Sequence, residues 1–210
     1  MTKTARIRVL IADDHPIVRA GLKALINRRP DMTVVAEAAD GREAVELFQQ
    51  HQPDITLMDL RMLKMGGIEA IQEIRRQHPT ARIIVFTAYD DDEDIYRGLQ
   101  AGAQAYILKD TPRQGLLDCI RTVAEGKTHL SSAVAAKLAE RLKMEALTPR
   151  ELETLQLMSA GKNNKEIAAA LSVVEGTVKV HVNNILEKLH VNNRTEAVAV
   201  AVKRGLIQIR

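Results

Sequence analysis

The chain has 210 residues, of which 46% are hydrophobic and only 2% are aromatic, so we expect one or two domains with aliphatic cores. The single cysteine, Cys119, excludes an internal disulfide, and its apolar helical surroundings favour a buried thiol. No apolar run approaches the roughly 18 residues of a membrane span, and the N-terminus is too charged for a signal peptide. We therefore expect a soluble, cytoplasmic protein with no membrane partner.

Charge is divided unevenly along the chain. Residues 1–127 contain 18 Lys and Arg against 19 Asp and Glu, a net charge of −1, whereas residues 128–210 contain 12 against 8, a net charge of +4. A weakly basic C-terminal part is compatible with a nucleic-acid partner, but neutral partners would suit it as well.

The first 127 residues alternate short apolar runs with helical patterns. The runs cover residues 7–12, 33–36, 55–58, 83–86 and 106–108. Short continuous runs between helices are typical of buried parallel strands. The predicted fold is therefore α/β, a doubly wound (βα)₅ domain, followed by an all-α domain of four helices.

Polar residues follow four of these runs: Asp13 and Asp14, then Asp59, Thr87 and Lys109. The carboxyl ends of parallel strands meet at one edge of the sheet, so we expect these side chains to lie together. Clustered carboxylates repel one another, and a hard divalent cation such as Mg²⁺ offsets that repulsion. A carboxylate can also attack phosphorus, while a lysine and a hydroxyl contact the phosphoryl oxygens. Each residue alone has an ordinary explanation, since Asp at a strand end often caps the next helix.

These residues resemble the receiver domain of bacterial two-component response regulators. The match is carried by Asp13-Asp14-His15, Asp59-Leu60-Arg61-Met62, Thr87-Ala88 and Lys109. The resemblance implies that Asp59 accepts phosphate from a sensor histidine kinase. It also implies an Mg²⁺ site formed by Asp13, Asp14, Asp59 and the carbonyl of Arg61.

The resemblance implies further roles, and this chain departs from the family in the loop after Asp59. Thr87 and Lys109 would contact the phosphoryl group, and Tyr106 would be the family's switch aromatic, although a core ring is its ordinary interpretation. Leu63 stands where the family usually has proline, so we expect a more mobile loop after Asp59. His15 is interpreted only as a loop residue.

The segment at residues 128–145 is expected to be a helical linker between a receiver at residues 1–127 and a second domain at 146–210. Ser131 fits the cap of a helix that carries Val134, Leu138 and Leu142.

The last part of the chain carries repeated helix-start signals. Thr148-Pro149 with Glu151, Asn163 with Glu166, and Asn193 with Glu196 each match a capping box. Between the last two, a helix from about Glu175 to His190 has a narrow apolar stripe. A tight turn before it completes a helix-turn-helix pattern, whose second helix would enter the major groove of DNA. An ordinary helical bundle fits the same pattern.

The detailed residues resemble a LuxR-type DNA-binding domain, and with the receiver they resemble the NarL/FixJ subfamily of response regulators. The motifs are Leu147-Thr148-Pro149-Arg150-Glu151, Asn164-Lys165-Glu166-Ile167-Ala168, Thr177-Val178-Lys179-Val180-His181, Lys188-Leu189 and Asn193-Arg194-Thr195-Glu196-Ala197. The resemblance implies that Lys179, Val180 and Asn183 face base edges. It assigns phosphate contacts to Thr177, Lys165 and Lys188, and dimerisation to the final helix, Asn193 to Arg204.

One departure concerns the start of the recognition helix. Val174 stands where the family normally has Ser or Thr, and it cannot accept the capping hydrogen bond. Gly176 in the first turn weakens that end further, so we predict a frayed N-terminus in the absence of DNA.

Three functions are candidates for this chain. The favoured one is a transcriptional response regulator, not an enzyme beyond Mg²⁺-dependent phosphorylation and dephosphorylation at Asp59. Its partners would be double-stranded promoter DNA, a sensor histidine kinase and a second copy on DNA, with RNA polymerase a further candidate. An aspartyl-phosphate phosphohydrolase would place its nucleophile on the first strand, which this chain does not. The third is a phosphorylation-independent DNA binder whose receiver is a dimerisation scaffold.

Overall fold

The computed structural model describes residues 6–142 and 145–207, which fall into two compact units, residues 1–139 and 140–210. Each unit has its own hydrophobic core. Within the described residues, no helix is long and apolar enough to cross a membrane.

The first unit is built around a parallel sheet with the strand order β2-β1-β3-β4-β5-β6. Its strands are β1 (Ile7–Ala12), β2 (Met32–Ala38), β3 (Ile55–Met58), β4 (Ile83–Thr87), β5 (Ala105–Leu108) and β6 (His129–Leu130). The predicted (βα)₅ α/β fold is confirmed. The two-residue strand β6, which pairs with β5, adds an edge that was not predicted.

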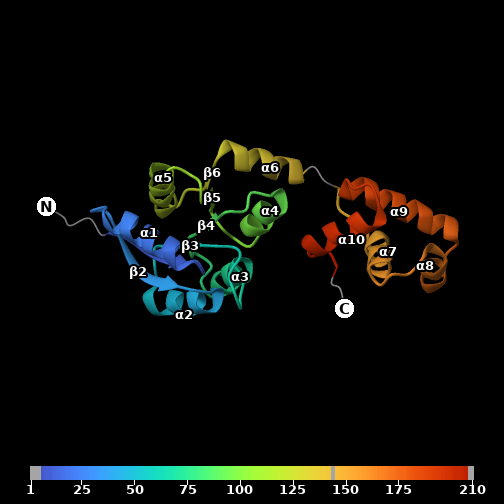
Figure 1. The fold of residues 1–210 in the computed structure, drawn as a ribbon, viewed down its shortest axis with the longest axis horizontal. Helices are drawn as coiled ribbons and strands as arrows, with labels where there is room; N and C mark the ends of the chain where they lie inside the picture. Colours follow the sequence, from blue (N-terminus) through green and yellow to red (C-terminus); the bar gives the residue numbers. More distant parts are fainter. Residues whose placement is uncertain (1–5, 143–144, 208–210) are drawn as a thin grey trace. The chain divides into compact units, whose positions relative to one another are not determined.

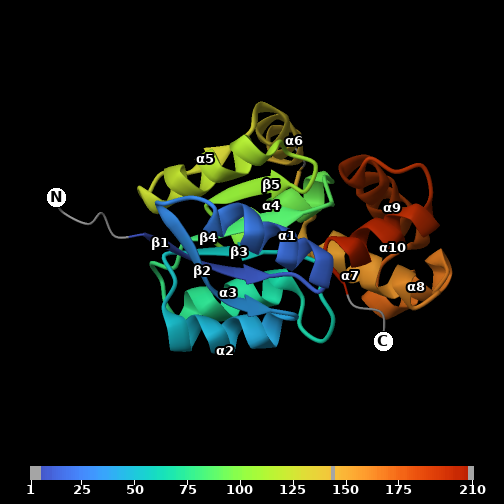
Figure 2. The ribbon, with the colours of Figure 1, turned by 60° about the vertical axis from the view of Figure 1, so that its left-hand side comes forward.

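Helices cover both faces of the sheet (Figures 1 and 2). They are α1 (Pro16–Asn27), α2 (Gly41–His51), α3 (Gly67–Gln77), α4 (Asp92–Gln100) and α5 (Arg113–Ala124). Leu22 and Ile26 of α1 share one core with α5, whereas Phe48 of α2 and Ile71 of α3 belong to the core on the opposite face. Cys119 of α5 is fully buried, and burial raises its pKa to about 12, as expected of a thiol with a packing role.

Helix α6 (Ser132–Leu142) follows β6, and Ser131 caps it as predicted, accepting a hydrogen bond from the Val134 N–H at 3.2 Å. Val134 is buried in the core that contains Tyr106, and Leu138 packs against the same core. The first part of the expected linker is therefore packed on the sheet unit.

The second unit contains α7 (Pro149–Ser159), α8 (Asn164–Leu171), α9 (Glu175–Leu189) and α10 (Arg194–Lys203). The two capping boxes at Thr148 and Asn163 form as predicted. The third differs, because the Glu196 carboxylate accepts from the Asn192 N–H instead of the Asn193 N–H. The buried residues of α10 are Ala197 and Ala201.

Candidate functional site

The ends of the strands bring the predicted site residues to one edge of the sheet. Because β1 and β3 are neighbours, Asp13 and Asp59 emerge side by side, and the Asp59 N–H donates to the carbonyl of Ala12 at 2.8 Å. The Lys109 N–H donates to the carbonyl of Thr87 at 2.8 Å, so the β4 and β5 ends are equally aligned. Asp13, Asp59 and Thr87 are all buried.

Lys109 joins two of the carboxylates. Its Nζ lies 2.7 Å from Asp59 Oδ2 and 2.8 Å from Asp13 Oδ2. The contact to Asp59 is a hydrogen bond, whereas the one to Asp13 is an ion pair without hydrogen-bond geometry at the carboxylate. Burial alone would lower the pKa of Lys109, but the neighbouring carboxylates of Asp13 and Asp59 outweigh that effect and raise the pKa. The lysine therefore stays charged and offsets part of the negative charge of the cluster.

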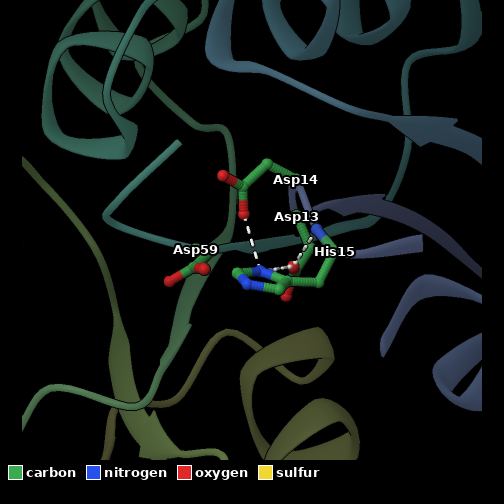
Figure 3. A group of neighbouring side chains, drawn as sticks. All are labelled: Asp13, Asp14, His15 and Asp59. Atoms are coloured by element: carbon green, nitrogen blue, oxygen red, sulfur yellow. Dashed lines mark hydrogen bonds and ion pairs between the residues drawn. The ribbon is translucent and has the colours of Figure 1, made fainter. Parts of the chain in front are cut away.

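Asp13, Asp14, His15 and Asp59 form a group whose ligand atoms all lie within 4.8 Å of one another (Figure 3). His15 Nδ1 lies 2.7 Å from Asp14 Oδ1 and 3.3 Å from Asp13 Oδ1. Oxygen donors at this spacing suit a hard divalent cation such as Mg²⁺, which prefers one or two carboxylates. The sequence did not identify His15 as a member of the group, since a histidine after two aspartates carries no signal by itself.

Thr87 and Tyr106 are both bound to the segment that follows β4. The buried Tyr106 donates its hydroxyl proton to the Tyr89 carbonyl at 2.7 Å. The Tyr89 N–H points at Thr87 Oγ1 across 3.5 Å. Burial, together with the negative charge of Asp94 and Asp91, raises the pKa of Tyr106. Both residues that were predicted to form a switch therefore hold Tyr89.

The side chain of Arg61 extends to the same segment. Its Cζ lies 3.7 Å from the centre of the Tyr89 ring, within the range of a cation–π contact, and Nη2 lies 3.3 Å from Asp94 Oδ2. Burial and Asp91 raise the pKa of Asp94, while Arg61 opposes that shift. The sequence assigned only the Arg61 carbonyl a role, and nothing in it indicated this side-chain contact.

The loop after Asp59 returns closely to the end of β3. A Cβ added at Gly67 would lie 1.9 Å from the carbonyl oxygen of Asp59, so only glycine fits there. Lys64 has a φ of +63°, and its Nζ pairs with Asp40 Oδ2 at 2.6 Å. Leu63, at the position where proline was expected, is 72% exposed.

In the second unit, α8 and α9 form the predicted helix-turn-helix, with Ser172 in the left-handed region between them. Val178, Ile185 and Leu189 are the buried residues of α9. Lys179, Val180 and Asn183, the predicted base-facing residues, are all exposed, as is Lys165 on α8, whereas Thr177 is half-buried. Lys179 Nζ lies 3.3 Å from Glu175 Oε1. The helix therefore turns a short basic and apolar surface to solvent.

Lys188 differs from the other predicted contacts. Its side chain is only 18% exposed, and Nζ lies 2.9 Å from Oε2 of Glu151, which is 3% exposed. Burial would raise the pKa of Glu151, but hydrogen bonds from the Thr148 backbone and Lys188 lower it overall. Lys188 is therefore part of the packing of α9 on α7.

The start of α9 carries the departure that the sequence indicated. Val174 is the N-cap residue, it is 72% exposed, and its side chain makes no capping hydrogen bond. The first turn of α9 therefore lacks the acceptor that Asn163 gives to α8.

Comparisons with known proteins match both units. Residues 9–121 match the model of the response regulator receiver domain, and residues 145–201 match that of the bacterial regulatory proteins of the luxR family. The transcriptional regulatory protein LiaR of Bacillus subtilis is 44% identical, covering 96% of this chain and 99% of its own length. YxjL of the same organism, an uncharacterised transcriptional regulatory protein, is 42% identical, with coverage of 97% and 98%.

A solved structure is similar over both units. The RcsB response regulator of Salmonella typhimurium superposes with a TM-score of 0.84 at 26% identity, covering 94% of this chain and 100% of that one. The relatives are similar over almost their full length, and the two family models together match most of the chain. The chain therefore belongs to the response regulators of two-component systems, the DNA-binding transcriptional regulators of the NarL/FixJ type that combine a receiver domain with a luxR-type helix-turn-helix domain.

Proposed function

We propose that phosphorylation of Asp59 by a cognate sensor histidine kinase switches the binding of this protein to promoter DNA. The observation that carries the proposal is the position of Asp59, whose carboxylate lies within 4.8 Å of ligand atoms of Asp13 and Asp14 and 2.7 Å from the ammonium of Lys109. A buried carboxylate with a neighbouring cation and an acidic group is suited to accept a phosphoryl group.

Asp13, Asp14, Asp59 and the Arg61 carbonyl would hold Mg²⁺. When bound, the ion neutralises charge that develops on the transferring phosphoryl group. An Asp59 carboxylate oxygen forms the new bond to phosphorus while the bond from phosphorus to the donor breaks, which gives an acyl phosphate. Lys109 pairs with a phosphoryl oxygen, and the Thr87 hydroxyl donates to another. This self-phosphorylation and its reversal by water are the only chemistry that we assign to the chain.

The switch would act through Thr87 and Tyr106. Phosphorylation adds about −1.5 to −2 charges at Asp59. Reorienting Thr87 toward that charge withdraws its hydroxyl from the Tyr89 N–H, which it now faces at 3.5 Å. Tyr106 is bound to the same residue, so the two side chains respond together.

DNA recognition would use the exposed surface of α9. Lys179 can bind guanine acceptors, Asn183 adenine, and Val180 a thymine methyl group. Lys165 and Thr177 would reach phosphates, and Lys188 has a remaining N–H donor for the same purpose. A structure of RcsB bound to DNA superposes with a TM-score of 0.75 at 25% identity over 94% of this chain, which supports the same mode of binding.

A second copy would bind the adjacent half-site. Val202 and Leu206, at and just beyond the end of α10, are 36% and 38% exposed and provide apolar surface for a two-fold contact. Two-fold symmetry would place two recognition helices one DNA turn apart. We further propose that the protein acts in the cytoplasm and that it contacts RNA polymerase at the promoter.

Intact-mass measurement tests the phosphorylation directly. The purified protein is incubated with Mg²⁺ and a small-molecule phosphodonor, alongside Asp59→Ala and the control Asp110→Asn, which changes an exposed aspartate outside the group. Wild type and Asp110→Asn gain one phosphoryl group, and Asp59→Ala gains none. Equal gain in wild type and Asp59→Ala would refute the assignment, and no gain in any of them would favour a constitutive DNA binder.

A further inference from the structure

The two-residue segment Tyr89-Asp90, between β4 and α4, is bound from several elements of the receiver. The hydroxyl of Tyr106 donates to the Tyr89 carbonyl at 2.7 Å, and Arg61 lies 3.7 Å over the Tyr89 ring. Thr87 Oγ1 faces the Tyr89 N–H at 3.5 Å. This one short segment is therefore contacted by Arg61 from the loop after Asp59, by the Thr87 hydroxyl and by the Tyr106 hydroxyl.

Helix α6 is attached to the same segment. Lys137 Nζ donates to both the backbone carbonyl and Oδ2 of Asp90, each at 2.5 Å. Both acceptors belong to one residue, so a rearrangement of Asp90 removes both at once. The Lys137 side chain is 41% exposed and that of Asp90 is 64% exposed. Both charges are therefore accessible to water, and breaking the pair costs little free energy.

The rest of the α6 contact involves the neighbours of Tyr106. Val134, which is 3% exposed, belongs to the same core as Tyr106 and Ile95, and Leu138 packs on that core. Leu130 of β6 pairs with Tyr106 in the sheet register. A change in the position of the Tyr106 ring therefore alters the packing beneath Val134 as well as the segment that holds Lys137.

We infer that α6 is a releasable element of the receiver: the Lys137–Asp90 pair holds it, and phosphorylation of Asp59 loosens it through Tyr89-Asp90. The trigger, phosphorylation of Asp59, rests on the proposed function. The Lys137–Asp90 pair, called the latch below, does not. Loosening α6 frees residues 131–142, so the tether that precedes α7 lengthens. A longer tether changes the effective concentration of one DNA-binding domain for another, and with it the stability of a dimer on DNA.

Hydrogen exchange of the full chain, read by mass spectrometry on peptides from residues 132–142, tests the latch without a phosphodonor. Lys137→Met removes the ion pair, and we expect about two- to five-fold faster exchange in α6, the range of an exposed pair. Lys137→Arg keeps the charge and restores slow exchange. Lys127→Met, which removes another exposed lysine–carboxylate pair, with Glu125, is the control and leaves α6 unchanged. Val134→Ala, which deletes buried methyl groups, gives a larger increase of roughly tenfold.

The trigger is tested in the same samples after treatment with Mg²⁺ and acetyl phosphate, with intact mass reporting phosphorylation. Phosphorylated wild type exchanges in α6 as fast as Lys137→Met or faster, while Lys137→Met gains the same phosphoryl mass and responds less. Unchanged α6 exchange in fully phosphorylated wild type overturns the inference and leaves the proposed function intact. If no mass is gained, the proposed function fails, and equal α6 exchange in wild type and Lys137→Met then overturns the latch as well.

Discussion

Lys109 Nζ lies 2.7 Å from Asp59 Oδ2, and the same ammonium lies 2.8 Å from Asp13 Oδ2. One cation thus bridges two buried carboxylates that emerge from neighbouring strands. A metal ion bound at this edge would compete with Lys109 for the same negative charge. Stability and cation affinity should therefore be coupled at this position.

Lys109→Met leaves Asp13 and Asp59 facing each other without that cation. We expect the free energy of unfolding to fall by about 2 kcal/mol in buffer with EDTA, because a buried carboxylate loses its partner. Millimolar Mg²⁺ should restore more stability to the variant than to wild type, since a ligand that binds only the folded state stabilises it. Urea unfolding with and without Mg²⁺ measures both effects. Lys127→Met, at an exposed pair, should change stability by less than about 0.5 kcal/mol, and equal effects at the two lysines would contradict the account.

Lys188→Met should destabilise the second unit. Glu151 would be left buried without its cation, at a cost of about 2 kcal/mol, whereas Lys179→Met removes only an exposed pair with Glu175. Hydrogen exchange in α7 and α9 of the full chain reports the difference. Comparable exchange in the two variants would show that the Lys188–Glu151 pair does not stabilise the unit.

The same pair should give an acid-dependent loss of stability. The pKa of Glu151 is lowered in the folded state, so its contribution is present above its unfolded pKa, roughly 4.3, and is lost as pH falls through the folded value. The difference between wild type and Lys188→Met should therefore shrink below about pH 4. Unfolding free energies at pH 3 to 7 test this, and a constant difference across that range would assign the effect to packing alone.

Val174→Ser should stabilise the start of α9. A serine at this N-cap can accept the hydrogen bond that valine cannot, which is worth about 1 kcal/mol. Thermal unfolding and slower exchange of the first α9 amides are the readouts. Val180→Ser, at another exposed valine inside the helix, is the control and should not stabilise it. No change at Val174→Ser would mean that the uncapped turn is already satisfied by water.

Tyr106 should make the receiver sensitive to alkaline pH. Its pKa is raised in the folded state, so its contribution is complete below the unfolded pKa of roughly 10 and is lost as pH rises above it. Between about pH 9 and 11, wild type should lose stability more steeply than Tyr106→Phe, which has no ionisable hydroxyl. Parallel pH profiles of the two proteins would contradict the burial of this hydroxyl.

The sequence predicted the sheet and the position of the site because both depend on local patterns. The runs at 55–58 and 7–12 match β3 and β1, and the residues after them, Asp59 and Asp13, do lie together. Parallel strands place their ends on one edge whatever the details of packing. The same logic applied to the caps at Thr148 and Asn163, which are set by residues three positions apart.

Other features depend on contacts that no local pattern encodes. Helix α4 was not located from the sequence, because its residues Asp92–Gln100 are mostly polar and only Ile95 forms a buried apolar anchor. The Lys188–Glu151 pair joins residues 37 positions apart, and the Lys137–Asp90 pair joins residues 47 apart. Charged residues look alike in sequence until the fold shows which partner each one contacts.

Phosphorylation of Asp59 should change DNA binding, and a binding titration tests this most directly. The DNA probe is a site selected from a random library with the phosphorylated protein. It is titrated with wild type and with Asp59→Asn, each with and without acetyl phosphate, at fixed salt. We expect phosphorylated wild type to bind at least several-fold more tightly than the untreated protein, while Asp59→Asn does not respond. Identical affinities for phosphorylated and unphosphorylated wild type, with phosphorylation verified by intact mass, would contradict it.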